Sequence, residues 1–315
     1  MDRILNGKEA SKKVKERVKK EVEILKEKKI EVCLAVILVG KDKASAIYVK
    51  NKQKACEETG IISKTIELDE NIKEKELLDI IDNLNKDKKV NGILVQLPLP
   101  QQIDEKKVID RIDDLKDVDC FNVKNIGKLV VGENCFLPCT PAGIIELIEQ
   151  KKIDIKGKHC VIVGRSNIVG KPLAFLMLQK DATVSICHSK TSNLEFFTKS
   201  ADILVAAVGK ENFITKDMVK KGAIVIDVGI NRNKEGKICG DVKFDEVFEV
   251  AEFITPVPGG VGPMTIATLL KNTVFAAKIQ NKLWNICLHN FYIFLILEFI
   301  NIFILKVFWF YRWLC

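Results

Sequence analysis

The chain of 315 residues has only three histidines, and no two of its ten cysteines are separated by just two residues. The closest pair is Cys135 and Cys139. Structural zinc sites need closely spaced ligands, so we expect no metal centre. A disulfide framework is typical of short secreted chains, and we therefore interpret the cysteines as reduced thiols of a cytoplasmic protein.

The N-terminus, MDRILNGKEASKK, lacks the apolar segment of a secretion signal. The formal net charge is +8, but the lysines are spread over helices and do not form runs interleaved with aromatic residues. We therefore expect no nucleic-acid partner, and a polyanionic small molecule fits better. The length indicates two domains.

A nucleotide-binding turn is indicated by residues 159–172, HCVIVGRSNIVGKP. An apolar β-branched run ends at Gly164, and a helical pattern begins near Gly170. In such a turn the backbone N–H groups and the positive end of the helix can meet a pyrophosphate. The spacing G-x-S-x-x-x-G departs from the common G-x-G-x-x-G, so this segment alone also fits an ordinary turn without a ligand.

The second strand of this unit, residues 182–187, is not followed by the carboxylate that reads the ribose of NAD. It runs into His188, Ser189 and Lys190, and Arg165 lies in the glycine turn. Arginine matches phosphate oxygens in a fork, whereas a carboxylate would repel them. The sequence therefore favours NADP as the cofactor.

Apolar runs alternate with amphipathic segments along the whole chain, which predicts an α/β fold made of two α/β domains, the second a Rossmann-like nucleotide-binding domain. The expected strands are 31–39, 61–68, 90–97, 160–163, 182–187, 202–208, 223–228 and 252–255. The expected helices are 8–29, 45–58 (capped by Gly60), 72–84, 144–151, one from Gly170 and one from Met264. The hydrophilic stretch 151–158 is the candidate hinge.

Three features of these segments can carry chemistry. Tyr48 and Lys52 share one face of a helix, and Gln96 lies at the carboxyl edge of a buried strand, where open α/β sheets bind ligands. The loop 256–263, PVPGGVGP, looks too rigid and bare to pack a core, which favours a backbone approach to a ligand. A structural interpretation stays open for the first two, namely a surface pair and a strand ended by Pro-Leu-Pro.

Eight segments together resemble the bifunctional methylenetetrahydrofolate dehydrogenase/methenyltetrahydrofolate cyclohydrolase family. They lie in about residues 1–281 and read YVKNK, VQLPLP, KDVD, PCTP, GRSNIVGKP, CHSKT, VIDVGINR and PVPGGVGPMT. The resemblance implies two α/β domains linked by long helices with a cleft between them, and a homodimer. It also implies NADP-dependent oxidation of 5,10-methylenetetrahydrofolate, then hydrolysis to 10-formyltetrahydrofolate, in one-carbon metabolism and purine biosynthesis.

The resemblance also implies roles for single residues. Lys52 matches the catalytic lysine, Tyr48 the aromatic residue that stacks on the folate, Gln96 the glutamine beside the lysine, and Asp119 the aspartate that holds the pterin ring. Further folate contacts are implied for Val95, Leu97, Pro258, Gly259, Gly260, Val261 and Gly262. Cofactor contacts are implied for Gly164, Arg165, Ser166, Ser189 and Ile230.

On this basis residues 1–141 are expected to form the folate-binding catalytic domain and 142–263 the NADP-binding domain. Residues 264–282 would form a helix that returns to the first domain. One departure concerns Cys120, which replaces the glycine that the family usually has after K-D-V-D. If the backbone there has a positive φ, a cysteine costs on the order of 1 kcal/mol and could displace Asp119.

The last segment, 283–315, is apolar and holds all three tryptophans of the chain. It is long enough for a membrane anchor. Alternatively it is read-through or frame-shifted translation of A/T-rich DNA, which is the interpretation we prefer.

Two other functions of the chain stay open. A non-catalytic folate-binding or membrane-tethered protein would follow if Cys120 disables the site, and an amino-acid dehydrogenase of similar layout would explain the glycine turn.

Overall fold

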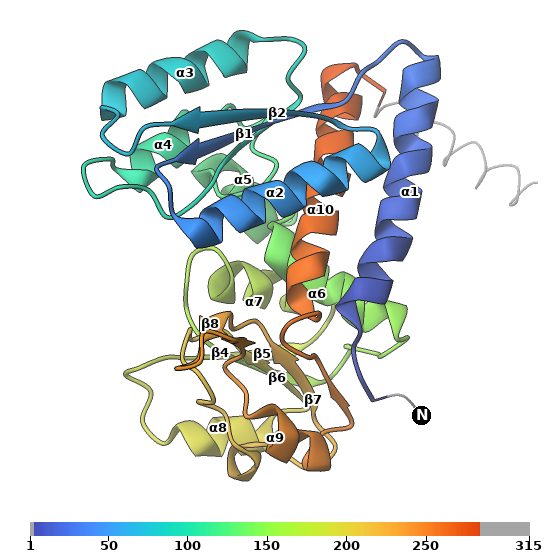
Figure 1. Cartoon of the computed structure of the whole chain (residues 1–315). Helices are drawn as coiled ribbons and strands as arrows, with labels where there is room; N and C mark the ends of the chain where they lie inside the picture. The colour runs from blue at the N-terminus through green and yellow to red at the C-terminus, as the bar shows by residue number, and fades with distance from the viewer. Residues whose placement is uncertain (1–2, 284–315) are drawn as a thin grey trace, which may run out of the picture.

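The computed structural model describes residues 3–283, which form two α/β units joined by long helices (Figure 1). The first unit contains a three-stranded parallel sheet in the order β2-β1-β3. Its strands are β1 (Cys33–Val39), β2 (Ile62–Leu68) and β3 (Gly92–Val95), and its helices are α2 (Lys43–Thr59), α3 (Glu74–Lys86), α4 (Glu105–Arg111) and α5 (Val123–Val131).

The central strand β1 is buried along its whole length, as its continuous apolar sequence predicts. The helix that follows it, α2, ends at Gly60, whose left-handed conformation with φ 79° confirms the predicted cap. Strand β3 ends at Val95, so Gln96 is the first residue after the strand. The sheet therefore delivers this amide to its carboxyl edge.

The second unit contains a five-stranded parallel sheet in the order β10-β7-β6-β4-β5. The chain starts at the interior strand β4, adds β5 on one side and β6 on the other, and so has the switch point of a doubly wound nucleotide-binding fold. Its strands are β4 (His159–Val163), β5 (Thr183–Cys187), β6 (Ile203–Ala206), β7 (Ile224–Asp227) and β10 (Phe253–Ile254). Around them lie α7 (Gly170–Leu178), α8 (Leu194–Ser200), the 3₁₀ turn η1 (Lys216–Met218), α9 (Phe244–Val250) and the hairpin of β8 (Asn231–Arg232) and β9 (Ile238–Cys239).

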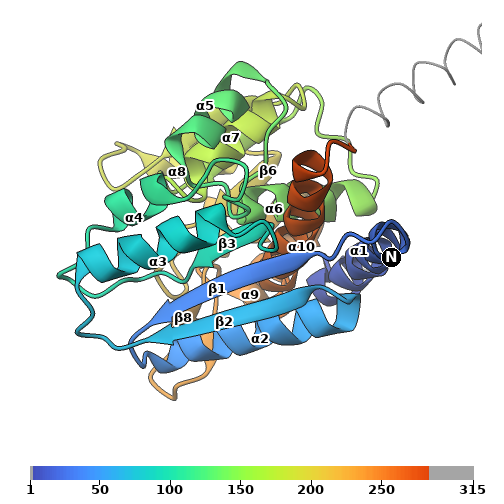
Figure 2. The same cartoon turned by 90° about the horizontal axis from the view of Figure 1, so that it is seen from above.

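Three helices connect the units: α1 (Gly7–Glu27), α6 (Cys139–Gln150) and α10 (Val261–Gln280). Figures 1 and 2 show α10 running beside α1, with α6 at the junction of the two units. The apolar stripe of α1 is buried as its spacing predicts, and Val14, Ile144 and Leu270 belong to one continuous core. The expected fold of two α/β units linked by long helices is confirmed.

Two predicted helix starts were wrong. Helix α6 begins at Cys139 rather than residue 144, and α10 begins at Val261 rather than Met264. Pro263 lies in the first turn of α10. Backbone N–H groups in a first turn have no intrahelical acceptor, so a proline there costs no hydrogen bond. The glycine-proline loop is therefore not too bare to pack, because Val261 is 4% exposed and joins the core. The sequence pattern does not predict α4, α5, α8, α9 or the hairpin.

Candidate active site

Lys52 and Gln96 form the centre of the site. Lys52 lies on α2 and is only 8% exposed, and its Nζ donates a hydrogen bond to Oε1 of Gln96 over 2.9 Å. The Nε2 of Gln96 donates to the carbonyl of Leu97 over 2.7 Å, which fixes the amide with its oxygen toward the lysine. Lys52 is thus not part of a surface pair, and Gln96 is not just the residue that ends a strand.

Asp119 supplies the charge that faces this lysine. Burial lowers the pKa of Lys52, and the carboxylate of Asp119 opposes that shift. In the same way burial raises the pKa of Asp119, while Lys52 and a hydrogen bond from the Cys139 thiol oppose it. Asp119 keeps part of its surface exposed. A bound molecule could therefore contact its carboxylate next to the amine of Lys52.

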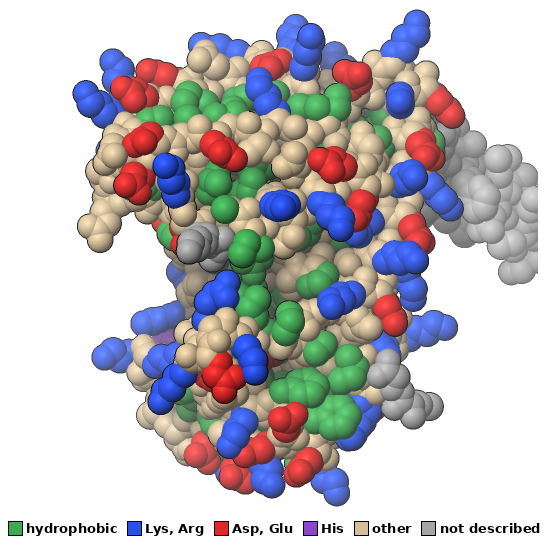
Figure 3. Space-filling model, in the orientation of Figure 1, with side chains coloured by type: hydrophobic (Ala, Val, Ile, Leu, Met, Phe, Trp, Pro, Cys, Tyr) green, Lys and Arg blue, Asp and Glu red, His purple; other side chains and the backbone are tan. Residues whose placement is uncertain are grey.

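Tyr48 lies one turn before Lys52 on α2 and is half-buried. Burial raises the pKa of its hydroxyl, and the charge of Arg232 in β8 opposes the shift. The charge of Arg232, in the second unit, therefore acts on the Tyr48 hydroxyl of the first unit. Figure 3 shows the surface hollowed between the two units. Arg232 is not among the site residues predicted from the sequence.

The loop before α10 passes over the start of α1. Gly259 accepts a hydrogen bond from the backbone N–H of Lys8 over 3.2 Å, and a Cβ on Gly7 would lie 1.6 Å from the carbonyl oxygen of Gly260. Pro258 is exposed, whereas Gly259 and Gly260 are buried. The loop is thus held against α1, and Pro258 is its most accessible residue.

The glycine turn after β4 has the tight geometry of a phosphate cradle. Gly164 has φ 138°, and a Cβ there would lie 2.2 Å from the carbonyl oxygen of Ala207. A Cβ on Gly170 would lie 2.1 Å from the carbonyl oxygen of Gly164. Ser166 Oγ accepts from the N–H groups of Val169 and Gly170 over 3.1 and 3.4 Å, so it ties the turn to the start of α7.

Exposed polar groups surround this turn. Arg165 and Ser166 are exposed, and Ser189 follows β5, which pairs in parallel with β4, so all three lie at one edge of the sheet. Ile230, after β7, is 51% exposed. Two glycines that admit no side chain and an exposed arginine between them fit a phosphorylated dinucleotide such as NADP.

Cys120 has φ 62°, which confirms that its position requires a left-handed backbone. Its thiol is fully buried and donates to the carbonyl of Phe136 over 3.0 Å. The charge of Lys52 still acts on Asp119, the residue before Cys120, and opposes the rise of its pKa.

Among residues 3–283 no group of three or more His, Cys, Asp or Glu side chains could hold a metal ion. No helix of that part of the chain is long and apolar enough to cross a membrane. The expectations about segment 283–315 concern residues outside the described range, Leu283 excepted.

Comparison with known proteins gives family and activity. The model of the tetrahydrofolate dehydrogenase/cyclohydrolase catalytic domain matches residues 5–119, and that of the NAD(P)-binding domain of the same family matches residues 138–281. The bifunctional protein FolD of Acetivibrio thermocellus is 59% identical over 89% of this chain and 99% of its own length.

Solved structures agree with this. The bifunctional FolD enzyme of Campylobacter jejuni is 53% identical, with a TM-score of 0.87 over 88% of this chain and 99% of its own. The Trypanosoma brucei enzyme, solved with NADP and an inhibitor, is 36% identical, with a TM-score of 0.84 over 87% of this chain and 97% of its own. The chain therefore belongs to the tetrahydrofolate dehydrogenase/cyclohydrolase family and is a bifunctional enzyme that carries both of its domains.

Proposed function

We propose that the two reactions of this enzyme take place in one cavity, around Lys52. These reactions are the NADP-dependent oxidation of 5,10-methylenetetrahydrofolate to the 5,10-methenyl compound and its hydrolysis to 10-formyltetrahydrofolate. The observation that carries the proposal is the buried Lys52, hydrogen-bonded to Gln96 and facing Asp119.

Lys52 is suited to move the proton of the hydrolytic step. An exposed lysine is almost fully charged at neutral pH, but burial lowers the pKa of Lys52 and increases the fraction of neutral amine. This amine takes a proton as the oxygen of water bonds to the electrophilic methenyl carbon. The ammonium then returns that proton to N5 as the bond from the carbon to N5 breaks. The remaining hydroxyl proton leaves to solvent as the C=O bond forms, so the formyl group stays on N10 and one proton is released overall. Gln96 orients the amine without adding charge.

The folate is assigned to the face of α2 that carries Tyr48 and to the sheet edge beside it. Tyr48 would stack on the ring system, and Asp119 would accept hydrogen bonds from the pterin. The remaining contacts are assigned to Val95, Leu97 and the loop of Pro258, Gly259, Gly260, Val261 and Gly262. Val261 is buried in the first turn of α10, so its part is to hold the loop in place.

NADP would be held by Gly164, Arg165, Ser166, Ser189 and Ile230, and when bound it supplies the acceptor for the hydride. The exposed guanidinium of Arg165 would pair with the 2′-phosphate. The glycines let the turn approach the pyrophosphate. Arg232 and Ile230 come from the segment after β7, on the side of the nucleotide unit that faces Tyr48.

The domain division follows from these assignments. We assign folate binding and catalysis to residues 1–141 and NADP binding to 142–263, with 264–282 as the returning part of α10. The eight cysteines between residues 3 and 283 are free thiols, which supports a cytoplasmic enzyme. Its 10-formyl product would serve purine biosynthesis.

We assign the homodimer contact to an apolar face on α5 and the end of α7, which lie side by side in Figure 2. Four exposed side chains make up this face: Val123, Val130, Val131 and Leu178. The first three follow helical spacing on one side of α5, and Gly127 between them leaves that side open. An apolar face of this kind on a folded domain favours contact with a second copy of the chain.

The decisive experiment is a coupled absorbance assay on the purified enzyme with methylenetetrahydrofolate. NADPH formation and the appearance and decay of the methenyl compound are followed together, with NADP and NAD in parallel. Formation of NADPH followed by decay of the methenyl compound supports the proposal. No turnover with either nucleotide would overturn it.

A further inference from the structure

Asp119 lies in a turn, outside any helix or strand. Its backbone must therefore be fixed by side chains from other elements. On one side, the Asp117 carboxylate accepts from the N–H of Asn122 over 2.9 Å and from the side chain of Asn125 over 2.9 Å. On the other side, the carbonyl of Val118, which belongs to the peptide bond leading into Asp119, is held by a residue of α10.

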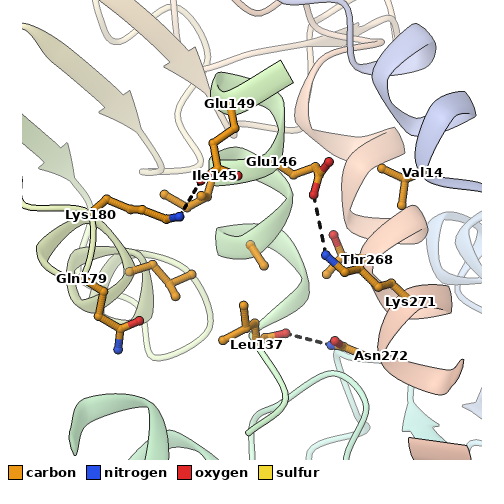
Figure 4. Close-up of a pocket in the computed structure, with 12 residues that line it drawn as sticks. Val14, Leu137, Ile145, Glu146, Glu149, Gln179, Lys180, Thr268, Lys271 and Asn272 are labelled. Atoms are coloured by element: carbon orange, nitrogen blue, oxygen red, sulfur yellow. Dashed lines mark hydrogen bonds and ion pairs between the residues drawn. The ribbon is translucent and has the colours of Figure 1, made fainter. Parts of the chain in front are cut away.

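That residue is Asn272. Its Nδ2 donates to the carbonyl of Val118 over 2.8 Å and to the carbonyl of Leu137 over 2.8 Å. Figure 4 shows the bond to Leu137. The two hydrogens of an amide have fixed directions in one plane, so a single side chain sets the separation of two loop segments. Asn272 is 6% exposed, and few water molecules can compete for these bonds.

The segment after Leu137 completes the arrangement through Cys139. Its thiol donates to the carbonyl of Val118 over 3.3 Å and also contacts the carboxylate of Asp119. Asn272 approaches the sulfur over 3.7 Å. The amide therefore holds both the peptide bond before Asp119 and the thiol that touches its carboxylate.

We propose that Asn272 is a positioning residue that holds the Asp119 carboxylate at the folate site through the carbonyls of Val118 and Leu137. Asn272 acts through Asp119 and does not touch the substrate. The inference rests on the proposed folate contact of Asp119, and α10 thereby has a part in substrate binding besides joining the units.

The test compares Asn272→Leu with Thr273→Val in the full-length enzyme. Leucine has a similar size and donates nothing, and the pocket of about 280 Å³ next to Asn272 gives it room (Figure 4). Thr273 is also buried on the same helix, but its hydroxyl donates over 2.8 Å to the carbonyl of Leu269 of that helix. Steady-state kinetics give separate KM values for methylenetetrahydrofolate and NADP, and thermal unfolding gives the loss of stability.

For Asn272→Leu we expect the KM for methylenetetrahydrofolate to rise about tenfold or more, because a shift of about 1 Å at a contact group is costly. The KM for NADP should change less than about twofold, since a folate-side shift does not alter the cofactor contacts. Asn272→Ser keeps one donor and should fall between wild type and Asn272→Leu. Thr273→Val should leave both KM values unchanged even if it lowers the melting temperature.

Asp119→Asn is measured beside these variants. It separates the proposed folate contact of Asp119 from the proposed positioning role of Asn272. If Asp119→Asn raises the folate KM and Asn272→Leu does not, the inference about Asn272 is wrong while the proposed site stands. If Asp119→Asn leaves the folate KM unchanged, the folate contact itself is wrong. A fall in kcat with both KM values unchanged for Asn272→Leu would indicate a merely structural role and overturn the inference. If Asn272→Leu does not fold, the Asn272→Ser enzyme decides by the same criteria.

Discussion

Arg232 of the nucleotide unit lies within charge range of the Tyr48 hydroxyl on α2 of the first unit. Figure 3 shows the surface hollowed between the two units that carry these residues. This relationship links the segment after β7 to the face of α2 that carries Tyr48 and Lys52. The proposed single cavity requires a folate beside Tyr48 to lie within reach of a nucleotide bound after β4.

Arg165 is expected to determine the preference for NADP. For Arg165→Ala the KM for NADP should rise about tenfold to a hundredfold, since a hydrogen bond to a charged group is worth about 1.5–3 kcal/mol. The KM for NAD should barely change, because NAD has no 2′-phosphate. Initial rates with both nucleotides provide the measurement, and Lys199→Ala, which removes an exposed cation of α8, is the control. An unchanged ratio of the two KM values would refute the phosphate contact.

Cys120 offers a comparison of two substitutions at one backbone conformation. Both Cys120→Gly and Cys120→Ala remove the buried thiol and its bond to Phe136, but alanine keeps the strained φ of 62°. We expect the glycine variant to be more stable than the alanine variant by about 1 kcal/mol, the reverse of the order in a helix interior. Urea unfolding of both variants gives the difference. A more stable alanine variant would show that the backbone there is not strained.

The pH dependence of hydrolysis should depend on Asp119. If the neutral amine of Lys52 is the base, the rate rises as pH rises through the pKa of Lys52, which burial lowers and Asp119 raises. Asp119→Asn removes the opposing charge and lowers the pKa of Lys52 further, so the rising limb should move to lower pH. The rate of methenyl hydrolysis is measured against pH at saturating substrate. A shift to higher pH would contradict this assignment.

The α5 face can be tested by one charge. Val131→Lys places an ammonium on a side chain that is 70% exposed, so the monomer should fold normally. If the face joins two copies, burying that charge is unfavourable and the dimer should dissociate. Light scattering after gel filtration gives the mass. Ile24→Lys, at an exposed position of α1, should leave the mass unchanged. A dimeric Val131→Lys would rule out the α5 face.

The sequence predicts elements that have a clear pattern, such as the continuous apolar run of β1 and the helical period of α1. It misplaced the start of α10 because proline usually interrupts a helix but fits its first turn, as Pro263 does here. The short helices α4 and α5 were not predicted, because seven to nine residues are too few to show a clear helical period of apolar residues.

The site divides in the same way. Local spacing predicts that Tyr48 and Lys52 share a face, and the strand end predicts the place of Gln96. The approach of Asp119 to Lys52 and of Asn272 to Val118 depends on contacts between distant segments. Spacing within one segment cannot predict such contacts, so sequence reasoning missed Asn272 altogether.

The claim that Lys52 carries the hydrolytic step from a cavity shared with the cofactor is tested most directly by Lys52→Met. Hydrolysis of added methenyltetrahydrofolate and the affinity for NADPH, from nucleotide fluorescence, are measured on the same enzyme, with Lys50→Met, an exposed lysine of the same helix, as the control. We expect Lys52→Met to lose hydrolysis by about a hundredfold or more, in the range of a general base, with NADPH affinity within about twofold of wild type. Hydrolysis at the wild-type rate, or a loss of cofactor affinity equal to the loss of hydrolysis, would contradict the role of Lys52.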